Sequence, residues 1–263
     1  MASTENEMSF LEHLEVLRWT LVRAFSAIVI CAIALFFCKT WLFDTIVLAP
    51  KNGDFLTYGL FCKLSHAIGL GDKLCMAEIP LTLQSITMSG QFSTHILVSF
   101  IGGFIIAFPV IIFEIWRFLK PGLKKTEQQL AKGLVFYSSL LFITGVLFGY
   151  FLIAPLSVQF LGSYQVSASV ANQISLNSFI TTVTTVTLAS GLVFQLPIVI
   201  YFLAKLGIVT PAFLRKYRKH ALVIVLILSA VITPPDITSQ ILVALPILLL
   251  YELSIIIAKK IQA

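Results

Sequence analysis

The sequence predicts an all-α polytopic membrane protein with six transmembrane helices. Hydrophobic residues make up 58% of the 263 residues, charged residues make up only 11%, and the mean hydropathy is +0.98. A soluble domain is about 25% charged, so this composition excludes a soluble fold. A spanning helix needs about 20 predominantly apolar residues to cross about 30 Å of hydrocarbon. The first four windows of sufficient length cover 22–49, 93–119, 134–156 and 175–206.

The last apolar run, residues 221–257, is about twice as long as one span requires. It is interrupted by "TPPDIT" at Thr233 to Thr238, and a helix does not continue through two prolines. We therefore expect two short helices, 221–232 and 239–257. The fifth would be only about 18 Å long unless it extends into the basic segment before it. All six helices are expected to form a single membrane domain, 1–263.

The distribution of Lys and Arg predicts that both termini are cytoplasmic. Most of the eighteen basic residues fall before the first window, in the second and fourth loops, or at the C-terminus. Only Lys39, Lys51, Lys63 and Lys73 fall on the other side. By the positive-inside rule the net charge of +6 is a topology signal, so we expect no nucleic-acid partner. The acidic N-terminus and the length of the first apolar run argue against a cleavable signal peptide.

A few polar residues fall within or near the ends of the apolar windows, where each has a structural and a functional interpretation. Glu114 precedes Arg117 by three residues, which favours a local ion pair. Glu252 is expected at the membrane interface. Gln195 precedes Pro197 in the middle of the fourth window, so it should lie beside a helix kink. It could either pack between helices or contact a segment that enters the membrane.

The cysteines and histidines predict no metal site and no catalytic centre. Cys31 and Cys38 fall on one helix and are expected to be packing residues. Cys62 and Cys75 fall in the first outer loop, where oxidising conditions permit a disulfide but spacing alone does not decide it. The four histidines lack metal-ligand spacing, and no nucleophile is placed with a base. We therefore expect neither an enzyme nor a cofactor.

Three classes remain: a transporter or channel, a machine that handles proteins, and a structural subunit. A secondary transporter is disfavoured because the sequence shows no inverted repeat. Four motifs then carry a resemblance over essentially the whole chain. They are "FLEHLEVLR" at Phe10–Arg18, "FEIWRFLKPGLKKTE" at Phe113–Glu127, "VFQLP" at Val193–Pro197 and "TPPDITSQILVALPILLLYE" at Thr233–Glu252. Their order and spacing resemble the TatC family, the six-helix core of the twin-arginine protein translocase.

The resemblance implies a cupped arrangement of six helices with short fifth and sixth members. It also implies a receptor in the bacterial cytoplasmic (inner) membrane that binds twin-arginine signal peptides of folded precursors at the cytoplasmic face. The implied partners are TatA-type and TatB-type single-span subunits, membrane lipid and further copies of the same chain. Transport would be driven by the proton-motive force. Because guanidinium groups pair with carboxylates in a bidentate fork, such a receptor needs acidic residues at that face.

Residue by residue, the resemblance assigns signal-peptide binding to the first and second motifs. Glu127 matches the glutamate of the first cytoplasmic loop that contacts the twin arginines. Phe118 matches an aromatic residue of the same surface, Pro121 matches a loop-shaping proline, and Arg18 closes the first motif. The resemblance assigns transport or partner contacts to Gln195, Asp236, Gln240 and Glu252.

The first motif departs from the family pattern at Val16, where a glutamate is usual. Glu12 and Glu15 are the candidate replacements. In a helical projection of Phe10 to Arg23, the acids lie opposite an apolar face, which predicts an interfacial helix that exposes them to the cytoplasm. Around the helix axis, Glu12 projects closer to the direction of Val16 than Glu15 does, but it lies one turn away along the axis. Glu15 lies next to Val16 along the axis but projects to the side. Because a Glu side chain swings sideways more readily than it reaches back along the axis, the sequence favours Glu15.

Overall fold

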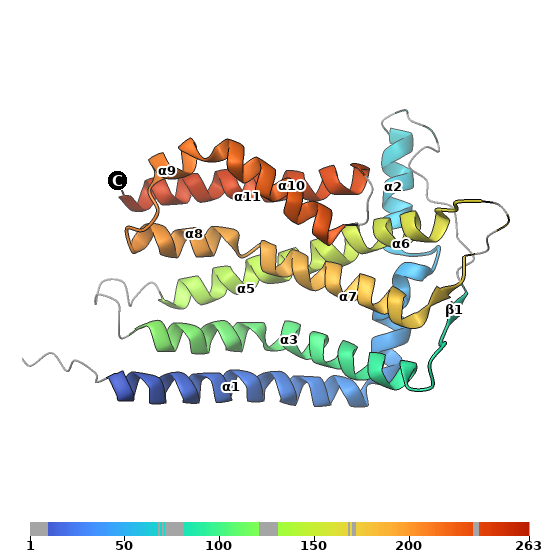
Figure 1. Cartoon of the computed structure of the whole chain (residues 1–263), viewed down its shortest axis with the longest axis horizontal. Helices are drawn as coiled ribbons and strands as arrows, with labels where there is room; N and C mark the ends of the chain where they lie inside the picture. Colours follow the sequence, from blue (N-terminus) through green and yellow to red (C-terminus); the bar gives the residue numbers. More distant parts are fainter. Residues whose placement is uncertain are drawn as a thin grey trace, which may run out of the picture. The chain divides into compact units, whose positions relative to one another are not determined.

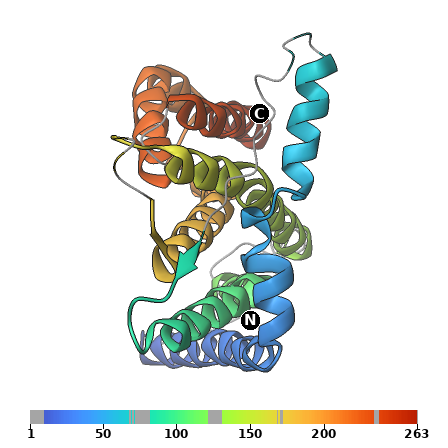
Figure 2. The same cartoon turned by 90° about the vertical axis from the view of Figure 1, so that its right-hand side faces the viewer.

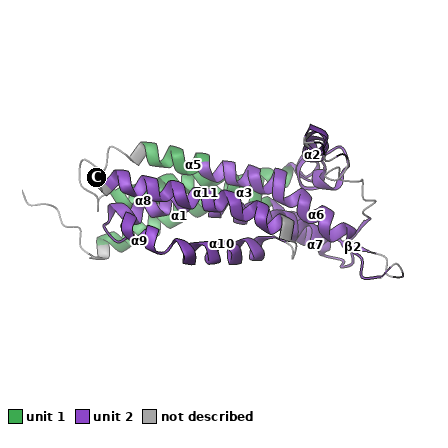
Figure 3. Ribbon diagram, turned by 90° about the horizontal axis from the view of Figure 1, so that it is seen from above, with its two compact units in different colours: residues 1–37, 99–140 green, residues 38–98, 141–263 purple. Residues whose placement is uncertain are grey.

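The computed structural model describes residues 10–67, 69, 71, 82–120, 131–167, 169, 172–233 and 237–262. The chain forms two compact units, shown in different colours in Figure 3. Unit 1 contains residues 1–37 and 99–140, and unit 2 contains residues 38–98 and 141–263. Each unit combines segments that are far apart in the sequence, so no linker separates them.

Long apolar helices dominate both units. Within the described ranges, five helical segments are long and apolar enough to cross a membrane: Glu12–Phe37, Gly90–Leu119, Gly133–Ser163, Leu176–Lys205 and Ser239–Ile261. Many of their outward side chains are large and apolar. Ile30, Phe113 and Leu249 are each more than half exposed, which a water-facing surface would not favour. These helices are therefore suited to a lipid environment, as the composition predicts.

Unit 1 is built on the packing of α1 (Phe10–Phe37) against the later part of α3 (Gly90–Leu119). Small residues allow the two backbones to approach closely. A Cβ added at Gly103 would lie 2.7 Å from the backbone nitrogen of Ala32, closer than real side chains come. In a membrane, where lipid is as apolar as leucine, this kind of close packing replaces the hydrophobic effect in holding helices together.

The beginning and end of the first helix differ from the prediction. The α-helix is continuous from Phe10 to Phe37, so residues 10–23 are its first turns and do not form a separate interfacial helix. The expected end at residue 49 is also wrong. A π-helix, η1 (Trp41–Val47), and a 3₁₀ turn, η2 (Ala49–Lys51), follow α1. Apolar composition continues through all of these segments, so hydropathy alone does not locate the change of helix type.

The third span contains a π-helical segment that a proline explains. It consists of α5 (Ala131–Phe148), the π-helix η5 (Gly149–Ile153) and α6 (Ala154–Ser163). Pro155 has no N–H to donate to the carbonyl four residues earlier, that of Phe151. The hydroxyl of Thr57 donates to this carbonyl instead. A donor from the segment between α1 and α3 therefore compensates for a proline in the third span.

Thr57 belongs to α2 (Leu56–Ala67), a helix that the sequence did not predict. Aromatic contacts hold the start of α2 against η5. The ring of Phe55 lies 5.6 Å from that of Tyr150 and 5.7 Å from that of Phe151. Tyr58 donates to the carbonyl of Pro50 at 2.6 Å, and burial raises the pKa of Tyr58 to about 12, so this hydroxyl keeps its proton. The start of α2 is thus anchored to the third span within unit 2.

The fourth span is broken where a kink was predicted. α7 (Leu176–Val193) ends just before Phe194 and Gln195, and α8 (Leu196–Lys205) begins with Pro197 in its first turn. Proline is compatible with the first turn of a helix, where its missing N–H has no intrahelical partner anyway. The prediction of a kink beside Gln195 is therefore confirmed.

The last three helices form a compact part of unit 2, visible in Figure 1. They are α9 (Pro211–Lys216), α10 (Arg218–Ile232) and α11 (Ile237–Gln262). α10 has 15 residues, which gives about 22 Å, so it is short even though it extends into the basic segment. The prediction of a short sixth helix is wrong, because α11 has 26 residues and continues through Lys259 and Lys260. Lysine favours helix and its long side chain reaches the interface, so the charges do not end α11.

A short parallel strand pair connects two loops of unit 2 at the same end as α2 (Figure 2). Leu83 of β1 (Leu83–Gln84) pairs with Ile174 of β2 (Ile174–Ser175). β2 leads directly into α7, and the Ser175 side chain accepts a hydrogen bond from the backbone N–H of Ser178. The pair therefore fixes the position at which α7 begins.

Gly145 and Gly149 of the third span pack against α7 and the residue that follows it, Phe194. A Cβ at Gly149 would lie 2.8 Å from the Cβ of Ser190 and 2.9 Å from the Cα of Thr187. Substituting Gly149→Val should therefore overpack this contact and destabilise the protein by about 1–3 kcal/mol. Thermal unfolding in detergent measures the effect. The matched control is Gly133→Val, because the nearest side-chain atom to a Cβ there is 4.0 Å away. Equal destabilisation by both substitutions would contradict this account.

Candidate functional site

The start of α1 and the end of α3 meet at one end of unit 1. The imidazole ring of His13 stacks on the ring of Phe118, with centroids 4.5 Å apart and an interplanar angle of 29°. His13 belongs to "HLEVLR" and Phe118 to "FEIWRFLK", two motifs separated by about a hundred residues. The fold therefore joins them into one surface.

A buried carboxylate lies one turn deeper in the same helix pair. Glu114 is 6% exposed. Its Oε2 accepts from Nε of Arg23 on α1 at 2.8 Å, and Nη1 of Arg117 lies 3.8 Å from its Oε1. The pair of Glu114 with Arg117, which the sequence predicts, is thus the longer contact. The closer partner is Arg23, which comes from another helix. A carboxylate in such a position needs a cation, because an unpaired charge away from water is costly.

The sequence does contain a signal for this pair. His13 and Arg23 follow one another along α1, while their partners Phe118 and Glu114 follow one another in the opposite direction along α3. This is the order of contacts in two antiparallel helices. Treating the first and second windows as such a pair would have brought Arg23 and Glu114 to the same end of the pair.

The acidic residues at the start of α1 have a different environment. Glu12, Glu15 and Arg18 are all exposed, in contrast to Glu114. Glu15 forms no ion pair with any residue that the structure describes. Val16, at the position where the family carries a glutamate, is half-buried. The unit 1 surface therefore combines an aromatic stack with exposed carboxylates.

Gln195 lies in unit 2, at the break between α7 and α8. Its backbone carbonyl accepts from the N–H groups of Ile198 and Val199 at 3.0 and 3.1 Å. Gln195 is half-buried. The break places a polar side chain within the length of an otherwise apolar span, Leu176–Lys205. In lipid, such a group is retained when it has a polar contact to make.

Gln240 and Glu252 connect α11 to α10. The Gln240 Nε2 donates to the carbonyl of Leu226 at 3.1 Å. At the other end of the pair, Nη2 of Arg218 lies 2.6 Å from Oε2 of Glu252, and both side chains are about half exposed. The exposed ion pair contributes little to stability by itself, about 0–1 kcal/mol. Both residues therefore have a structural contact within unit 2.

Several residues assigned from the sequence lie outside the described residues: Glu127, Pro121, Asp236 and Cys75. Cys62, on α2, is disulfide-bonded, and Cys31 and Cys38 are free. Throughout the described ranges, no three His, Cys, Asp or Glu side chains gather closely enough to hold a metal ion.

Comparison with known proteins identifies the family. The family of the Sec-independent protein translocase protein TatC matches over residues 12–246. This chain belongs to the TatC family. A TatC protein of Blattabacterium from Periplaneta americana is 39% identical over 259 residues, covering 98% of this chain and 97% of the relative. TatCy of Bacillus subtilis is 33% identical, covering 97% and 90% of the two chains.

The fold agrees with the sequence relationship. The crystal structure of a twin-arginine translocase receptor, TatC, has a TM-score of 0.71 and 32% sequence identity to this chain. The alignment covers 96% of this chain and 100% of that chain. The resemblance inferred from four motifs is therefore confirmed over nearly the whole TatC chain. The protein is a membrane-embedded component of the Sec-independent, twin-arginine protein translocase.

The ion pair between Arg23 and Glu114 yields a stability prediction. The Arg23→Gln variant should be less stable by about 3 kcal/mol, because it leaves a buried carboxylate without its closest cation. The unfolding midpoint in detergent measures this loss. Arg117→Gln is the matched control and should cost much less, because its guanidinium is mostly exposed and lies 3.8 Å from Glu114. A larger effect of Arg117→Gln would show that the local pair dominates.

Proposed function

We propose that this chain is the core receptor subunit of the twin-arginine translocase. It binds the twin-arginine signal peptides of folded precursors at the end of unit 1 where α1 begins and α3 ends. The observation that supports this most directly is the stack of His13 on Phe118, which joins the first two motifs into one surface. Exposed carboxylates lie on the same turns of α1 as His13. An aromatic surface flanked by acids suits a ligand with two guanidinium groups.

The carboxylates that can serve a ligand differ from those that hold the fold. Glu114 is buried and already paired with Arg23, so it is assigned to structure. Glu12 and Glu15 are exposed on α1. Glu127 follows α3 by a few residues in the sequence and is the acid that the family resemblance assigns to the twin arginines. We therefore assign one arginine to Glu127 and the other to an acid on α1.

Helix geometry separates the two candidates on α1. His13 faces α3, since its ring contacts Phe118. At about 100° per residue, Glu12 points about 40° from Val16 and about 100° from His13, whereas Glu15 points about 160° from His13. Glu12 thus flanks the side of α1 that meets α3, and Glu15 points away from it. This contact shifts the assignment to Glu12, in place of the Glu15 favoured by the sequence alone.

The orientation and partners follow from charge and family. The basic residues flanking the spans support a proposal in which the chain crosses the bacterial cytoplasmic membrane six times, with the start of α1 and both termini in the cytoplasm. TatA-type and TatB-type subunits and further copies of this chain complete the translocase in this proposal. The proton-motive force drives transport, and the chain itself catalyses no reaction.

Substitution of the proposed carboxylates tests the assignment. Glu127→Ala and Glu12→Gln should each weaken binding of a twin-arginine precursor about tenfold, because each removes a charge-assisted hydrogen bond to a guanidinium. Glu15→Gln should change binding by less than about twofold, because its side chain points away from Phe118. Site-specific photo-cross-linking of the precursor to membranes containing each variant measures binding.

Two controls accompany this experiment. The amount of each variant in the membrane must match that of the unsubstituted chain, and a precursor with both signal arginines changed to glutamine should not cross-link to any of them. Unchanged cross-linking to Glu127→Ala would contradict the receptor proposal. Loss in Glu15→Gln without loss in Glu12→Gln would instead return the α1 contact to Glu15.

Gln195 is proposed to contact a segment that enters the membrane after docking. Gln195→Phe should reduce transport of a precursor more than its docking, because the polar contact is needed only within the span. Val199→Phe on α8 is the matched control, since Val199 is half exposed and apolar. Transport into membrane vesicles and precursor cross-linking are measured in parallel. Equal loss of transport and docking in Gln195→Phe would indicate misfolding and contradict this role.

A further inference from the structure

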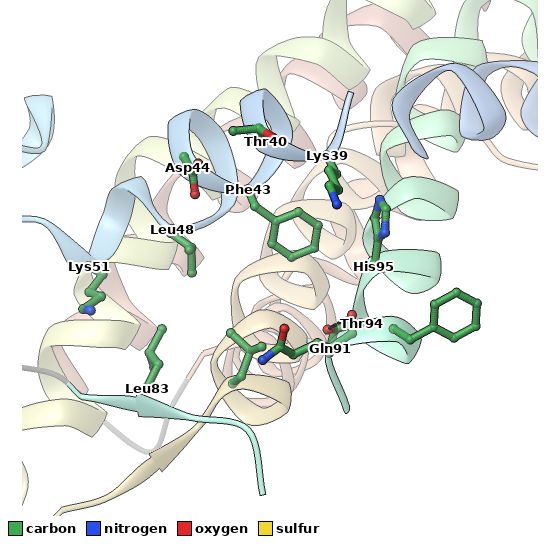
Figure 4. A pocket seen from close by; sticks show the side chains of 12 residues that line it. Lys39, Thr40, Phe43, Asp44, Leu48, Lys51, Leu83, Gln91, Thr94 and His95 are labelled. Carbon is green, nitrogen blue, oxygen red and sulfur yellow. Dashed lines mark hydrogen bonds between the residues drawn. The ribbon is translucent and has the colours of Figure 1, made fainter. Parts of the chain in front are cut away.

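Unit 2 contains a cavity of about 600 Å³ that none of the assigned functional residues line (Figure 4). Its walls come from the turn after α1, from η1, from β1 and from the first residues of α3 and α7. Segments that are far apart in the sequence therefore build it together. The pairing of β1 with β2 fixes one of its walls, because Leu83 of β1 lines the cavity and β2 leads into α7.

The charged residues of this cavity are unbalanced. Lys39 and Lys51 line it, and Asp44 is the carboxylate that lines it with them. Within the described part of the chain, neither lysine forms an ion pair and Asp44 forms none either. The cavity therefore carries two ammonium groups against one carboxylate. A concave site with this excess attracts an anion.

Hydrogen-bond donors surround one of these charges. In Figure 4 the side chain of Lys39 extends toward His95 on α3, and Gln91 lies one turn before His95. The ring of His95 is in turn held by an edge contact with Phe43, with centroids 5.6 Å apart. An ammonium and an imidazole, with an amide on the same cavity wall as the imidazole, are groups that suit phosphate oxygens.

The cavity also lies at the level where membrane spans begin. Two candidate spans begin at Gly90 and Leu176, and Gln91 and Leu176 line the cavity. The first span ends at Phe37, two residues before Lys39. Because the ends of membrane spans lie near the phospholipid headgroups, we expect the cavity to lie at that depth. Phe92, which lines the cavity, is 62% exposed, so an apolar surface adjoins the charged one.

We propose that this cavity binds the phosphodiester headgroup of an anionic phospholipid. Lys39 and Lys51 attract the phosphate, and the acyl chains lie on the apolar surface that includes Phe92. Asp44 weakens this attraction and so limits the affinity. The site follows the end of α1 in the sequence, and none of the residues that we assign to signal-peptide binding line it.

Lipid retention tests the proposal directly. The full chain is transferred into mixed micelles of phosphatidylcholine with a minority of phosphatidylglycerol, and native mass spectrometry counts the lipids that remain bound. The unsubstituted chain should retain phosphatidylglycerol in preference to phosphatidylcholine. In the double variant Lys39→Gln with Lys51→Gln, the preference for phosphatidylglycerol over phosphatidylcholine should fall about tenfold, because two cations are removed. Asp44→Asn should raise this preference, because it removes a negative charge that repels the phosphate.

Further variants separate the lipid site from general charge and from misfolding. Lys63→Gln, on the exposed face of α2 and outside this cavity, should leave the preference unchanged. Lys39→Arg with Lys51→Arg should retain it, which a collapse of the fold would not allow. Equal retention of the two lipids, or an unchanged preference in the double Gln variant, would overturn the proposal. Displacement of phosphatidylglycerol by inorganic phosphate alone would overturn the lipid assignment in favour of a free anion.

Discussion

A proline removes the hydrogen-bond donor of the carbonyl group four residues before it. Inside a bilayer that carbonyl cannot bond to water, so it needs another donor. This constraint organises much of unit 2. Pro155 creates such a carbonyl at Phe151, and Thr57 of α2 donates to it. Tyr150, in the π-helix η5, donates to the carbonyl of Ile46 at 2.6 Å, within the π-helix η1. These two hydrogen bonds hold the segment between α1 and α3 to the third span.

The need to pair buried polar groups also separates the acidic residues of unit 1 into two kinds. Glu114 is enclosed and neutralised by Arg23, so its charge is used within the helix pair. Glu12 and Glu15 remain exposed at the end of that pair. The helix pair thus contains acids of two kinds: one that fixes the helices and others whose side chains are exposed. The aromatic stack of His13 on Phe118 joins the two helices at the same end.

The spans could be predicted from the sequence because hydropathy and proline position act locally. The windows around 93–119 and 175–206, the kink beside Gln195 and the short α10 all follow from composition within one segment. The π-helical segments, α2 and the strand pair could not be predicted in this way, because each depends on donors or partners supplied from elsewhere in the chain. The predicted end at residue 257 was the end of the apolar run, whereas α11 continues beyond it through Lys259 and Lys260 because lysine is a good helix former.

For the candidate site, the motifs located the right segments but not their contacts. Phe118 was assigned from its motif, whereas its partner His13 and the pair of Arg23 with Glu114 required the antiparallel register of α1 and α3. Such contacts join residues about ninety or more positions apart, and no local pattern encodes them. The missing glutamate at Val16 was visible in the sequence alone, but which neighbour faces α3 depends on how α1 is rotated, and only tertiary packing fixes that rotation.

The short α10 has a consequence for biosynthesis. At about 22 Å it does not cover about 30 Å of hydrocarbon, so it is a poor membrane segment by itself. Its carbonyl at Leu226 is engaged by Gln240, and its Arg218 by Glu252, both from α11. Until α11 has been synthesised, these groups of α10 lack their partners. α10 therefore depends on α11, and we expect the two helices to enter the membrane together.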